Sequence, residues 1–258
     1  MVLKPFFTIL TASLNSSATL GKTLASVLEQ SFDDLEHIVV DGGSSDHTLE
    51  VLSDYEKTYN LKWISEPDSG IASALNKGLR LAKGKYVLVL QADDRFAGPE
   101  VLARVHTLLE QELYDIGVFP VYRERSSNRR FLHRPFKIRW WYHFKTIFPH
   151  QGSFIHRRLY ERLGDYREEL IIVLDYDFFY RALQSRCTVK LHDDPVAIMG
   201  GEGISSSRDY LLLRLREESY VQALNETNLF WRAMQLLFRT AYMPYKIRFM
   251  PYWRKQRS

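Results

Sequence analysis

The sequence contains a single cysteine, Cys187, which excludes a disulfide bond within the chain. The lack of disulfides fits a reducing compartment, and we expect Cys187 to be a small buried apolar side chain. No apolar run approaches the roughly 20 residues that a membrane-spanning helix needs. The chain opens without the charged and apolar regions of a secretory signal. We therefore expect neither a transmembrane helix nor a signal peptide.

Closely spaced glycines are missing where one large class of nucleotide-binding folds needs them. The segment from Thr11 to Gly21, which follows the first predicted strand, lacks the glycine fingerprint that holds a dinucleotide pyrophosphate. This absence argues against a nicotinamide oxidoreductase built on a Rossmann fold.

Acidic residues are scarce in two stretches, although the net charge of the whole chain is only +4. From Arg123 to Lys145 there are eight Lys or Arg residues and one acid, Glu124. From Leu229 to Ser258 there are seven Lys or Arg residues and no acid. Basic segments of this kind favour an anionic partner such as phosphate groups, nucleic acid or a lipid surface.

Apolar and β-branched runs alternate with segments of helical periodicity in the first 90 residues. The predicted strands are residues 5–11, 35–40, 61–65 and 86–90, and the predicted helices are residues 18–30, 48–59 and 71–82. This alternation predicts an α/β fold with a doubly wound, mostly parallel, Rossmann-like sheet flanked by helices. Further strands are predicted at 114–122, 188–191 and 196–199, and further helices at 100–111, 158–163, 176–186 and 209–238.

The apolar strand from Tyr86 to Leu90 runs into two adjacent carboxylates, Asp93 and Asp94. Ligands of open α/β sheets bind beyond the carboxyl ends of the strands. Two acids at that edge repel each other, and a divalent cation held together with substrate phosphates is the usual reason for such a pair. A solvated turn after the strand is the alternative, because Asp is common in turns.

Further motifs stand in a definite order along the chain. Before the aspartate pair come Thr11-Ala12-Ser13, Asp41-Gly42-Gly43-Ser44-Ser45-Asp46, Glu66-Pro67-Asp68-Ser69-Gly70-Ile71 and Asn76-Lys77-Gly78. After it come Pro149-His150-Gln151, Leu163-Gly164, Leu174-Asp175-Tyr176-Asp177-Phe178 and Gly203-Ile204-Ser205-Ser206. This order and spacing resemble the family 2 glycosyltransferases, which have the GT-A fold, over about residues 6–207. The resemblance implies a GT-A domain at 1–207, and the basic, aromatic segment 208–258 would be a helical extension.

The resemblance implies an inverting enzyme of the bacterial polysaccharide-biosynthesis type. Such an enzyme moves a sugar from a nucleotide-diphosphate sugar, with UDP favoured, to a saccharide or a polyprenyl-linked saccharide. Thr11 and Ser13 would contact the base and ribose of the donor. Asp41 would accept a hydrogen bond from the base, and Gly42 would let the backbone come close to it.

The aspartate pair takes its role from the same resemblance. Asp93 would hold the ribose or share the metal, and Asp94 would ligate Mn²⁺ or Mg²⁺ bridging the donor diphosphate. That cation would neutralise charge on the leaving nucleoside diphosphate. Asn76 and Lys77 lie where the family has diphosphate-facing or structural helix residues, and for Lys77 a solvated cation is the alternative.

His150 would ligate the metal or hold a phosphate oxygen. Its alternative role is that of a partly buried histidine satisfied by a backbone carbonyl. The glycine-rich segment from Gly200 to Ser207 would cover the donor and exclude water.

The resemblance also implies that Asp175 is the general base, which would take the proton from the acceptor hydroxyl. Many relatives have Glu before this Asp, whereas this chain has Leu174, and Asp177 is therefore a rival. If a helix begins here, the two carboxylates point in different directions, and one of them would cap the helix.

The last thirty residues combine aromatic side chains with the seven cations. Basic amphipathic segments with aromatic anchors lie in the membrane interface and are attracted by anionic lipids. We predict that this tail holds the chain on an anionic membrane surface, as a cytoplasmic protein peripheral to the inner face of the cell membrane. A helix packed on the core, or a contact with another protein, is the alternative. The segment 123–145 would belong to the same surface or to the acceptor site.

A non-catalytic membrane- or nucleic-acid-binding module on a Rossmann-like fold is the competing hypothesis. It leaves the carboxylates of Asp41, Asp94 and Asp175 unexplained, since acids near a phosphate backbone oppose binding unless a metal is present. We therefore expect no nucleic-acid partner.

Overall fold

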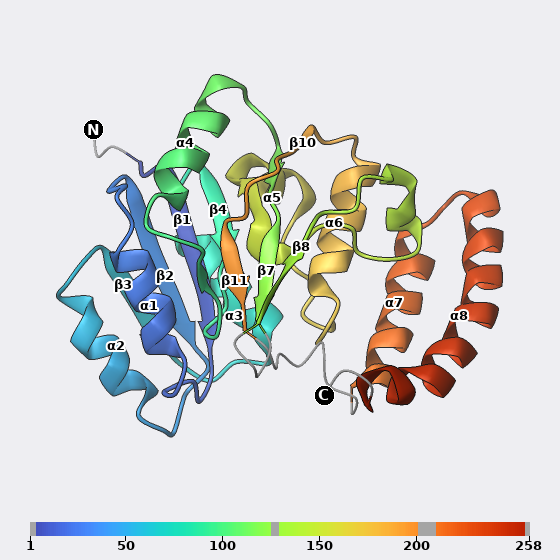
Figure 1. Ribbon diagram of the computed structural model, residues 1–258, viewed down its shortest axis with the longest axis horizontal. Helices are drawn as coiled ribbons and strands as arrows, with labels where there is room; N and C mark the ends of the chain where they lie inside the picture. Colours follow the sequence, from blue (N-terminus) through green and yellow to red (C-terminus); the bar gives the residue numbers. More distant parts are fainter. Residues whose placement is uncertain (1–3, 125–128, 201–209, 256–258) are drawn as a thin grey trace.

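The computed structural model describes residues 4–124, 129–200 and 210–255. The main sheet has the strand order β10-β6-β9-β4-β1-β2-β3 (Figure 1). Its strands are β1 (Phe7–Ser13), β2 (Leu35–Asp41), β3 (Leu61–Ser65), β4 (Tyr86–Val89), β6 (Ile116–Val118), β9 (Ser153–His156) and β10 (Val189–Leu191). Strand β9 runs antiparallel to its neighbours β4 and β6, and the others are parallel. The predicted mostly parallel sheet is confirmed.

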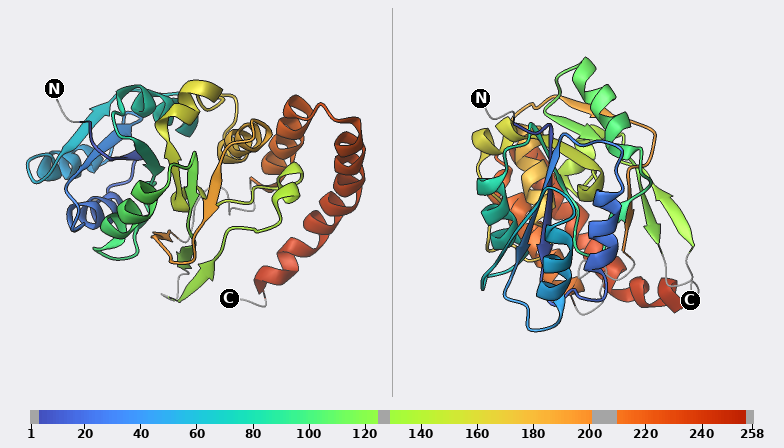
Figure 2. Two further views of the ribbon diagram at one scale, coloured as in Figure 1. Left: turned by 90° about the horizontal axis from the view of Figure 1, so that it is seen from above. Right: turned by 90° about the vertical axis from the view of Figure 1, so that its left-hand side faces the viewer.

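The two central strands explain why helices cover both faces of this sheet. Every residue of β1 and β4 is buried, so each strand needs apolar partners on both sides. Leu10 packs in the cluster that includes α3 (Ile71–Leu81), α5 (Arg157–Leu163) and α6 (Leu174–Gln184). The other face packs against α1 (Leu20–Leu28), α2 (Thr48–Glu56) and α4 (Val101–Gln111). Figure 2 shows these helices on opposite sides of the sheet.

The predicted strand at 114–122 is in fact two strands that belong to different sheets. It divides at Phe119 and Pro120, where proline cannot donate to a ladder, and continues as β7 (Val121–Glu124). Strand β7 joins a second sheet, in the order β5-β11-β7-β8. Its other strands are β5 (Arg95–Phe96), β8 (Arg130–His133) and β11 (Ala197–Met199). Strand β8 has no buried residue, so the sequence has no alternation of apolar and polar residues that would predict this strand.

The helical pattern predicted from 209 to 238 forms two helices, α7 (Leu211–Asn225) and α8 (Leu229–Lys255). Asn228 separates them, because its Oδ1 accepts the backbone N–H of Phe230 at 2.9 Å and of Trp231 at 3.4 Å. This is the geometry of a helix N-cap. In Figure 1, α8 is the outermost helix on the side away from β3. Within the described ranges, no helix has the length and apolarity that crossing a membrane requires.

Candidate active site

Strands β1, β2 and β4 bring their carboxyl ends together at one edge of the main sheet. Ser13, the last residue of β1, is the register partner of Asp41, the last residue of β2. On the other side of β1, the backbone N–H of Leu90 donates to the carbonyl of Leu10. The residues that follow Leu90 therefore begin next to the ends of β1 and β2. This edge is where the sequence predicts the donor site.

Thr11 and Ser13 differ in what their hydroxyl groups are free to do. Thr11 Oγ1 donates to the carbonyl of Leu90 at 2.6 Å and lies 2.9 Å from His37 Nε2. Burial lowers the pKa of His37 to about 3, so the imidazole is neutral. Ser13 is also buried, but its Oγ has no hydrogen-bond partner among the described residues. Of the two hydroxyls, only that of Ser13 is left to serve a ligand.

Asp41 is fully buried and mainly organises the turn after β2. Its Oδ2 accepts the backbone N–H groups of Gly43 and Ser44, at 3.1 and 2.8 Å, and the hydroxyl of Ser65 at 2.7 Å. Its Oδ1 accepts the Ser44 hydroxyl at 2.5 Å. A carboxylate has about four acceptor positions, so the remaining capacity of Asp41 lies on Oδ1.

Gly42 fills a position where a side chain does not fit. A Cβ atom built on Gly42 would lie 2.7 Å from Asp68 Oδ2. The backbone N–H of Gly42 donates to the carbonyl of Ser13 at 2.8 Å. The glycine therefore lets the loop after β3 approach the end of β2 closely.

Asp93 and Asp94 form a carboxylate pair at the same edge. Asp94 is buried, and its Oδ1 accepts the backbone N–H of Gly200 at 3.0 Å while its Oδ2 accepts that of Gln91 at 3.2 Å. The side chain of Gln151 is close enough to Asp94 to favour its ionised form. Burial raises the pKa of Asp94 to about 7, with a further contribution from the charge of Asp93. Burial raises the pKa of Asp93 as well. Ionising both carboxylates therefore costs free energy unless a cation is close by.

Within the described ranges, protein groups alone do not form a complete metal site. Among the described residues, no three His, Cys, Asp or Glu side chains gather closely enough to hold a metal ion. The hard oxygen atoms of Asp93 and Asp94 suit Mg²⁺ or Mn²⁺, and such ions commonly complete their coordination with substrate phosphates and water.

Asn76 and Lys77 use their polar groups for contacts within the protein. Asn76 is buried and pairs with the backbone of Tyr166 in both directions at 2.9 Å. Lys77 forms an ion pair with Glu66 at 2.8 Å and donates to the carbonyl of Pro67 at 3.1 Å. Both residues tie α3 to neighbouring loops, and their contact with a donor stays a prediction.

His150 is the sequence neighbour of Gln151, whose side chain lies close to Asp94. Its Nε2 is 2.9 Å from the hydroxyl of Tyr166, and burial lowers the pKa of the imidazole to about 4. The partner of this histidine is thus a tyrosine, and the imidazole is neutral. The side chain that reaches Asp94 from this segment is the neighbouring Gln151.

Asp175 and Asp177 both lie in the first turn of α6 but have different partners. Asp177 forms an ion pair with Arg167. It also accepts hydrogen bonds from Arg181 Nε at 2.9 Å and from Asn225 Nδ2 at 2.8 Å.

Asp175 is half-buried, and its Oδ1 accepts the backbone N–H of Tyr176 at 2.7 Å. Burial raises the pKa of Asp175 to about 6, and the charge of Glu218 adds to the shift. Asp175 thus has the surroundings of a general base, whereas Asp177 has those of a structural carboxylate.

The sequence did not point to Glu217, and it indicated a different role for Gly200, as part of a segment that covers the donor. Glu217 of α7 accepts the backbone N–H groups of Ile171, Ile172 and Val173 at 2.9–3.1 Å, and so holds the segment that leads into Asp175. Gly200 supports Asp94 from a distant part of the chain. The glycine-rich segment continues at 201–207, which lies outside the described residues.

Comparisons with known proteins identify the family of this chain. Residues 8–164 match Glycosyl transferase family 2. An uncharacterised glycosyltransferase of Mycobacterium tuberculosis is 32% identical over 217 residues, which cover 78% of this chain and 82% of the relative.

Two solved structures share the fold at low sequence identity. One is residues 1–349 of S. aureus TarS in complex with UDP-GlcNAc, with a TM-score of 0.69, 21% identity, and coverage of 86% of this chain and 67% of TarS 1–349. The other is the mannosyltransferase PcManGT from Pyrobaculum calidifontis in complex with GDP-Man and Mn²⁺, with a TM-score of 0.68, 18% identity, and coverage of 95% and 72%. The family match and the fold together show that the chain belongs to glycosyl transferase family 2 and has the GT-A fold.

Proposed function

We propose that this glycosyltransferase moves a sugar from a UDP-sugar to a hydroxyl group of a saccharide or polyprenyl-linked saccharide, with inversion at the anomeric carbon. The observation that carries the proposal is the pair formed by the half-buried Asp93 and the buried Asp94 at the carboxyl edge of the sheet, whose pKa values are both raised by burial. Such a pair supports the binding of a divalent cation together with a diphosphate.

The donor would lie along the ends of β1, β2 and β4. The hydroxyl of Ser13 is available for the nucleoside, and Oδ1 of Asp41 can accept one more hydrogen bond. The UDP-GlcNAc complex of TarS and the GDP-Man complex of PcManGT support a nucleotide-sugar donor. The TarS complex contains a UDP-sugar, and UDP-sugars are the donors that we propose first.

Asp93 and Asp94 are the residues that would hold Mn²⁺ or Mg²⁺. The ion would neutralise charge on the departing nucleoside diphosphate. The Mn²⁺ in the PcManGT structure supports the use of a divalent cation. His150 is the weaker candidate ligand, because its Nε2 is engaged by Tyr166.

Asp175 would act as the base in a single displacement. Its carboxylate takes the proton from the acceptor hydroxyl, the acceptor oxygen forms a bond to the anomeric carbon, and the bond to the diphosphate oxygen breaks. Asp175 lies near this edge: burial raises the pKa of Tyr166, the charge of Asp175 adds to the shift, and the Tyr166 hydroxyl lies 2.9 Å from His150 Nε2. The adjacent residue, Gln151, reaches Asp94.

The C-terminal part of the chain, 208–258, would hold this GT-A domain on an anionic membrane at the cytoplasmic face. Its helix α8 exposes apolar side chains on one side, among them Phe230 and Leu237, each 63% exposed. Arg232 and Arg248 of the same helix are exposed cations. Apolar and cationic groups on one exposed helix support binding to an anionic lipid surface.

Turnover of nucleotide sugars tests the proposal directly. The purified chain is incubated with UDP- and GDP-sugars, with and without Mn²⁺, and release of the nucleoside diphosphate is measured. We expect release from a UDP-sugar that depends on Mn²⁺, and a higher melting temperature with UDP plus Mn²⁺ than with either alone. Stabilisation by NAD, with none by any nucleoside diphosphate, would contradict it.

A further inference from the structure

Apolar side chains are exposed along the segment 129–141, which contains β8 and leads into the 3₁₀ helix η1 (Arg139–His143). Five large ones are each 41–50% exposed: Phe131, Leu132, Phe136, Ile138 and Trp140. Single exposed apolar residues are ordinary, but a row of them in one segment marks an interaction surface. The exposed side chains of 129–141 are called the β8–η1 surface below.

Ring contacts connect the β8–η1 surface to α8. The Trp140 ring stacks on that of Trp231 of α8, with 6.2 Å between the ring centres and 19° between the planes. Trp231 in turn meets the exposed ring of Phe230 at 5.2 Å. Figure 2 shows β8 and the C-terminal end of α8 on the same side of the molecule in both views. The exposed apolar groups of the two segments therefore adjoin one another.

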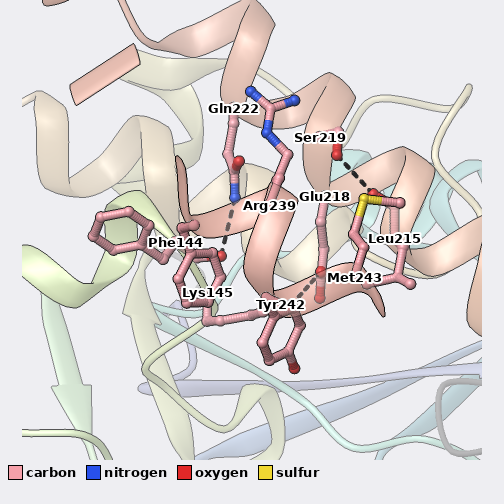
Figure 3. Close-up of a pocket in the computed structure, with 10 residues that line it drawn as sticks. Phe144, Lys145, Leu215, Glu218, Ser219, Gln222, Arg239, Tyr242 and Met243 are labelled. Carbon is pink, nitrogen blue, oxygen red and sulfur yellow. Dashed lines mark hydrogen bonds and ion pairs between the residues drawn. The ribbon is translucent and has the colours of Figure 1, made fainter. Parts of the chain in front are cut away.

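Hydrogen bonds fix the end of η1 to both C-terminal helices. Gln235 Nε2 of α8 donates to the carbonyl of His143 at 2.9 Å. Gln222 Nε2 of α7 donates to the carbonyl of Phe144 at 2.9 Å, a contact that Figure 3 shows. These contacts hold the β8–η1 surface and the exposed side of α8 in one arrangement, so that both can meet the same flat partner.

The β8–η1 surface carries cations and no acids. The segment 129–141 has no Asp or Glu, and its five Lys and Arg side chains are all exposed: Arg129, Arg130, Arg134, Lys137 and Arg139. Arg130 and Arg134 each have one acidic partner, at 3.1 and 3.3 Å. Within the described ranges, Arg129 and Lys137 have no ion-pair partner. Cations placed between exposed apolar side chains complement an anionic lipid surface.

The exposure of β8 favours a lipid partner over a folded protein. It is an edge strand of the second sheet, and Phe131 and Leu132 are consecutive, so their side chains point to opposite faces. All four residues of the strand are exposed. A folded protein would cover one face, whereas lipid molecules can surround both. The outer backbone groups of β8 need hydrogen-bond partners, which the wet headgroup region provides and the hydrocarbon core does not.

The β8–η1 surface is connected to the helix that carries the proposed base. The hydroxyl of Tyr176 in α6 donates to the carbonyl of Tyr142 in η1 at 2.9 Å. Tyr176 directly follows Asp175 in the chain. A membrane on this surface would therefore lie next to α6, which suits an acceptor whose lipid anchor stays in the bilayer.

We propose that the β8–η1 surface is a second membrane-contact site, formed by the catalytic domain itself. Its apolar side chains enter the headgroup region of an anionic bilayer, and its cations bind lipid phosphates. The proposal rests on the proposed function, because it takes the membrane at α8 as the place where the acceptor is met. Two contacts fix the orientation of the domain, whereas α8 alone would leave the domain free to rotate about the helix axis.

Binding of the full-length protein to vesicles tests this site. Vesicles of phosphatidylcholine are prepared with and without phosphatidylglycerol, and the bound fraction is measured by flotation. We expect L132Q/I138Q to lower the partition coefficient for the anionic vesicles at least about tenfold, because two apolar side chains no longer leave water. L81Q changes a leucine of comparable exposure, 45%, at the end of α3, and should leave the coefficient unchanged.

The contribution of charge is tested separately. R129Q/K137Q should weaken binding to the anionic vesicles at least about tenfold and leave binding to the neutral vesicles unchanged, because each cation near an anionic surface adds attraction. K22Q/K57Q removes two exposed cations of α1 and of the end of α2, and is the matched control. Equal losses in the two double variants would show that only net charge matters, and would contradict a local site.

A fluorophore on L132C reports insertion directly. Labelling is selective, because the native Cys187 is buried. We expect the emission to shift to shorter wavelength with anionic vesicles, and the same label on L81C to give no shift. An unresponsive label on L132C would overturn the proposal.

Two further outcomes overturn it. One is vesicle binding that L132Q/I138Q leaves unchanged and F230Q/L237Q removes, because α8 would then be the sole contact. The other is a dimer of the unaltered protein in solution that L132Q/I138Q dissociates, because a second copy would then cover this surface. Release of nucleoside diphosphate from a UDP-sugar is measured without vesicles in parallel. Its absence in the unaltered protein would count against the proposed function and not against the membrane contact.

Discussion

Asp175 and Asp177 are two residues apart in the first turn of α6 and have opposite electrostatic surroundings. Asp177 is 0% exposed and lies between Arg167 and Arg181. Asp175 has no arginine or lysine partner among the ion pairs of the described residues, and burial raises its pKa to about 6. The same helix thus supplies one neutralised structural carboxylate and one carboxylate that is free to accept a proton.

Replacing Asp175 with Asn should abolish most of the turnover and leave donor binding intact. A general base contributes about 10²- to 10⁴-fold to a rate, so we expect kcat to fall by that factor. The Kd for UDP with Mn²⁺, measured by titration calorimetry, should stay within about twofold. A variant with nearly normal kcat would show that Asp175 is not the base.

Replacing Asp177 with Asn should instead destabilise the fold. The substitution leaves Arg167 and Arg181 without their carboxylate, and breaking a buried pair typically costs about 3–5 kcal/mol. We expect the lower end of this range, because Arg167 is partly exposed. Urea unfolding measures the change, with Asp193→Asn as the control for a surface pair, where about 0–1 kcal/mol is expected. Equal effects at the two positions would contradict this assignment.

The rate should depend on pH through Asp175. A carboxylate acts as a base only when it is ionised, and the raised pKa of about 6 places this ionisation above that of an ordinary Asp. With Mn²⁺ at a saturating concentration, which favours the ionised forms of Asp93 and Asp94, we therefore expect kcat/KM to rise about tenfold per pH unit below pH 6 and to level off above it. The residual activity of Asp175→Asn should lack this acidic limb. If the limb persisted unchanged in that variant, another group would be responsible.

Gly200 should be sensitive to the addition of one methyl group. A Cβ atom at this position would lie 2.2 Å from Asp93 Oδ2, so the aspartate pair or the backbone that supports Asp94 must shift. Changes in groups that orient metal ligands typically cost about 10- to 100-fold in metal affinity. We expect Gly200→Ala to raise the Mn²⁺ concentration for half-maximal activity by about tenfold. Gly98→Ala is the matched control, because a Cβ there meets no atom within 4 Å.

The exposed side of α8 should determine membrane binding. Burying one Leu or Phe side chain contributes about 1.5–3 kcal/mol, so Phe230→Gln combined with Leu237→Gln should reduce sedimentation with anionic liposomes by at least about tenfold. Leu212→Gln changes a comparably exposed leucine of α7, at 53%, and serves as the control. Unchanged sedimentation of the double variant, or equal binding of the unaltered protein to neutral vesicles, would argue for a different role of this face.

Local patterns in the sequence were sufficient for the central parallel strands and for the sheet edge at which Ser13 and Asp41 end their strands. The apolar run from Tyr86 to Leu90 and the β-branched residues of β1 and β2 are buried on both faces, so composition alone identifies them as central strands. Because parallel strands end at a common edge, the sequence predicted that Ser13, Asp41 and Asp94 lie near one another. Strand β8 was not predicted, because none of its residues is buried and its sequence lacks the pattern of a half-buried strand.

Tertiary structure alone decided which of the candidate groups remain available for chemistry. Thr11 and Ser13 look equivalent in the sequence, yet only Thr11 meets His37 and Leu90 across the sheet. Likewise Asp177 is neutralised by arginines brought to it by a loop and by the helix turn that follows it, while Asp175 is not. Hydrogen-bond partners depend on side chains that are distant in the chain, and no periodicity of neighbouring residues encodes them.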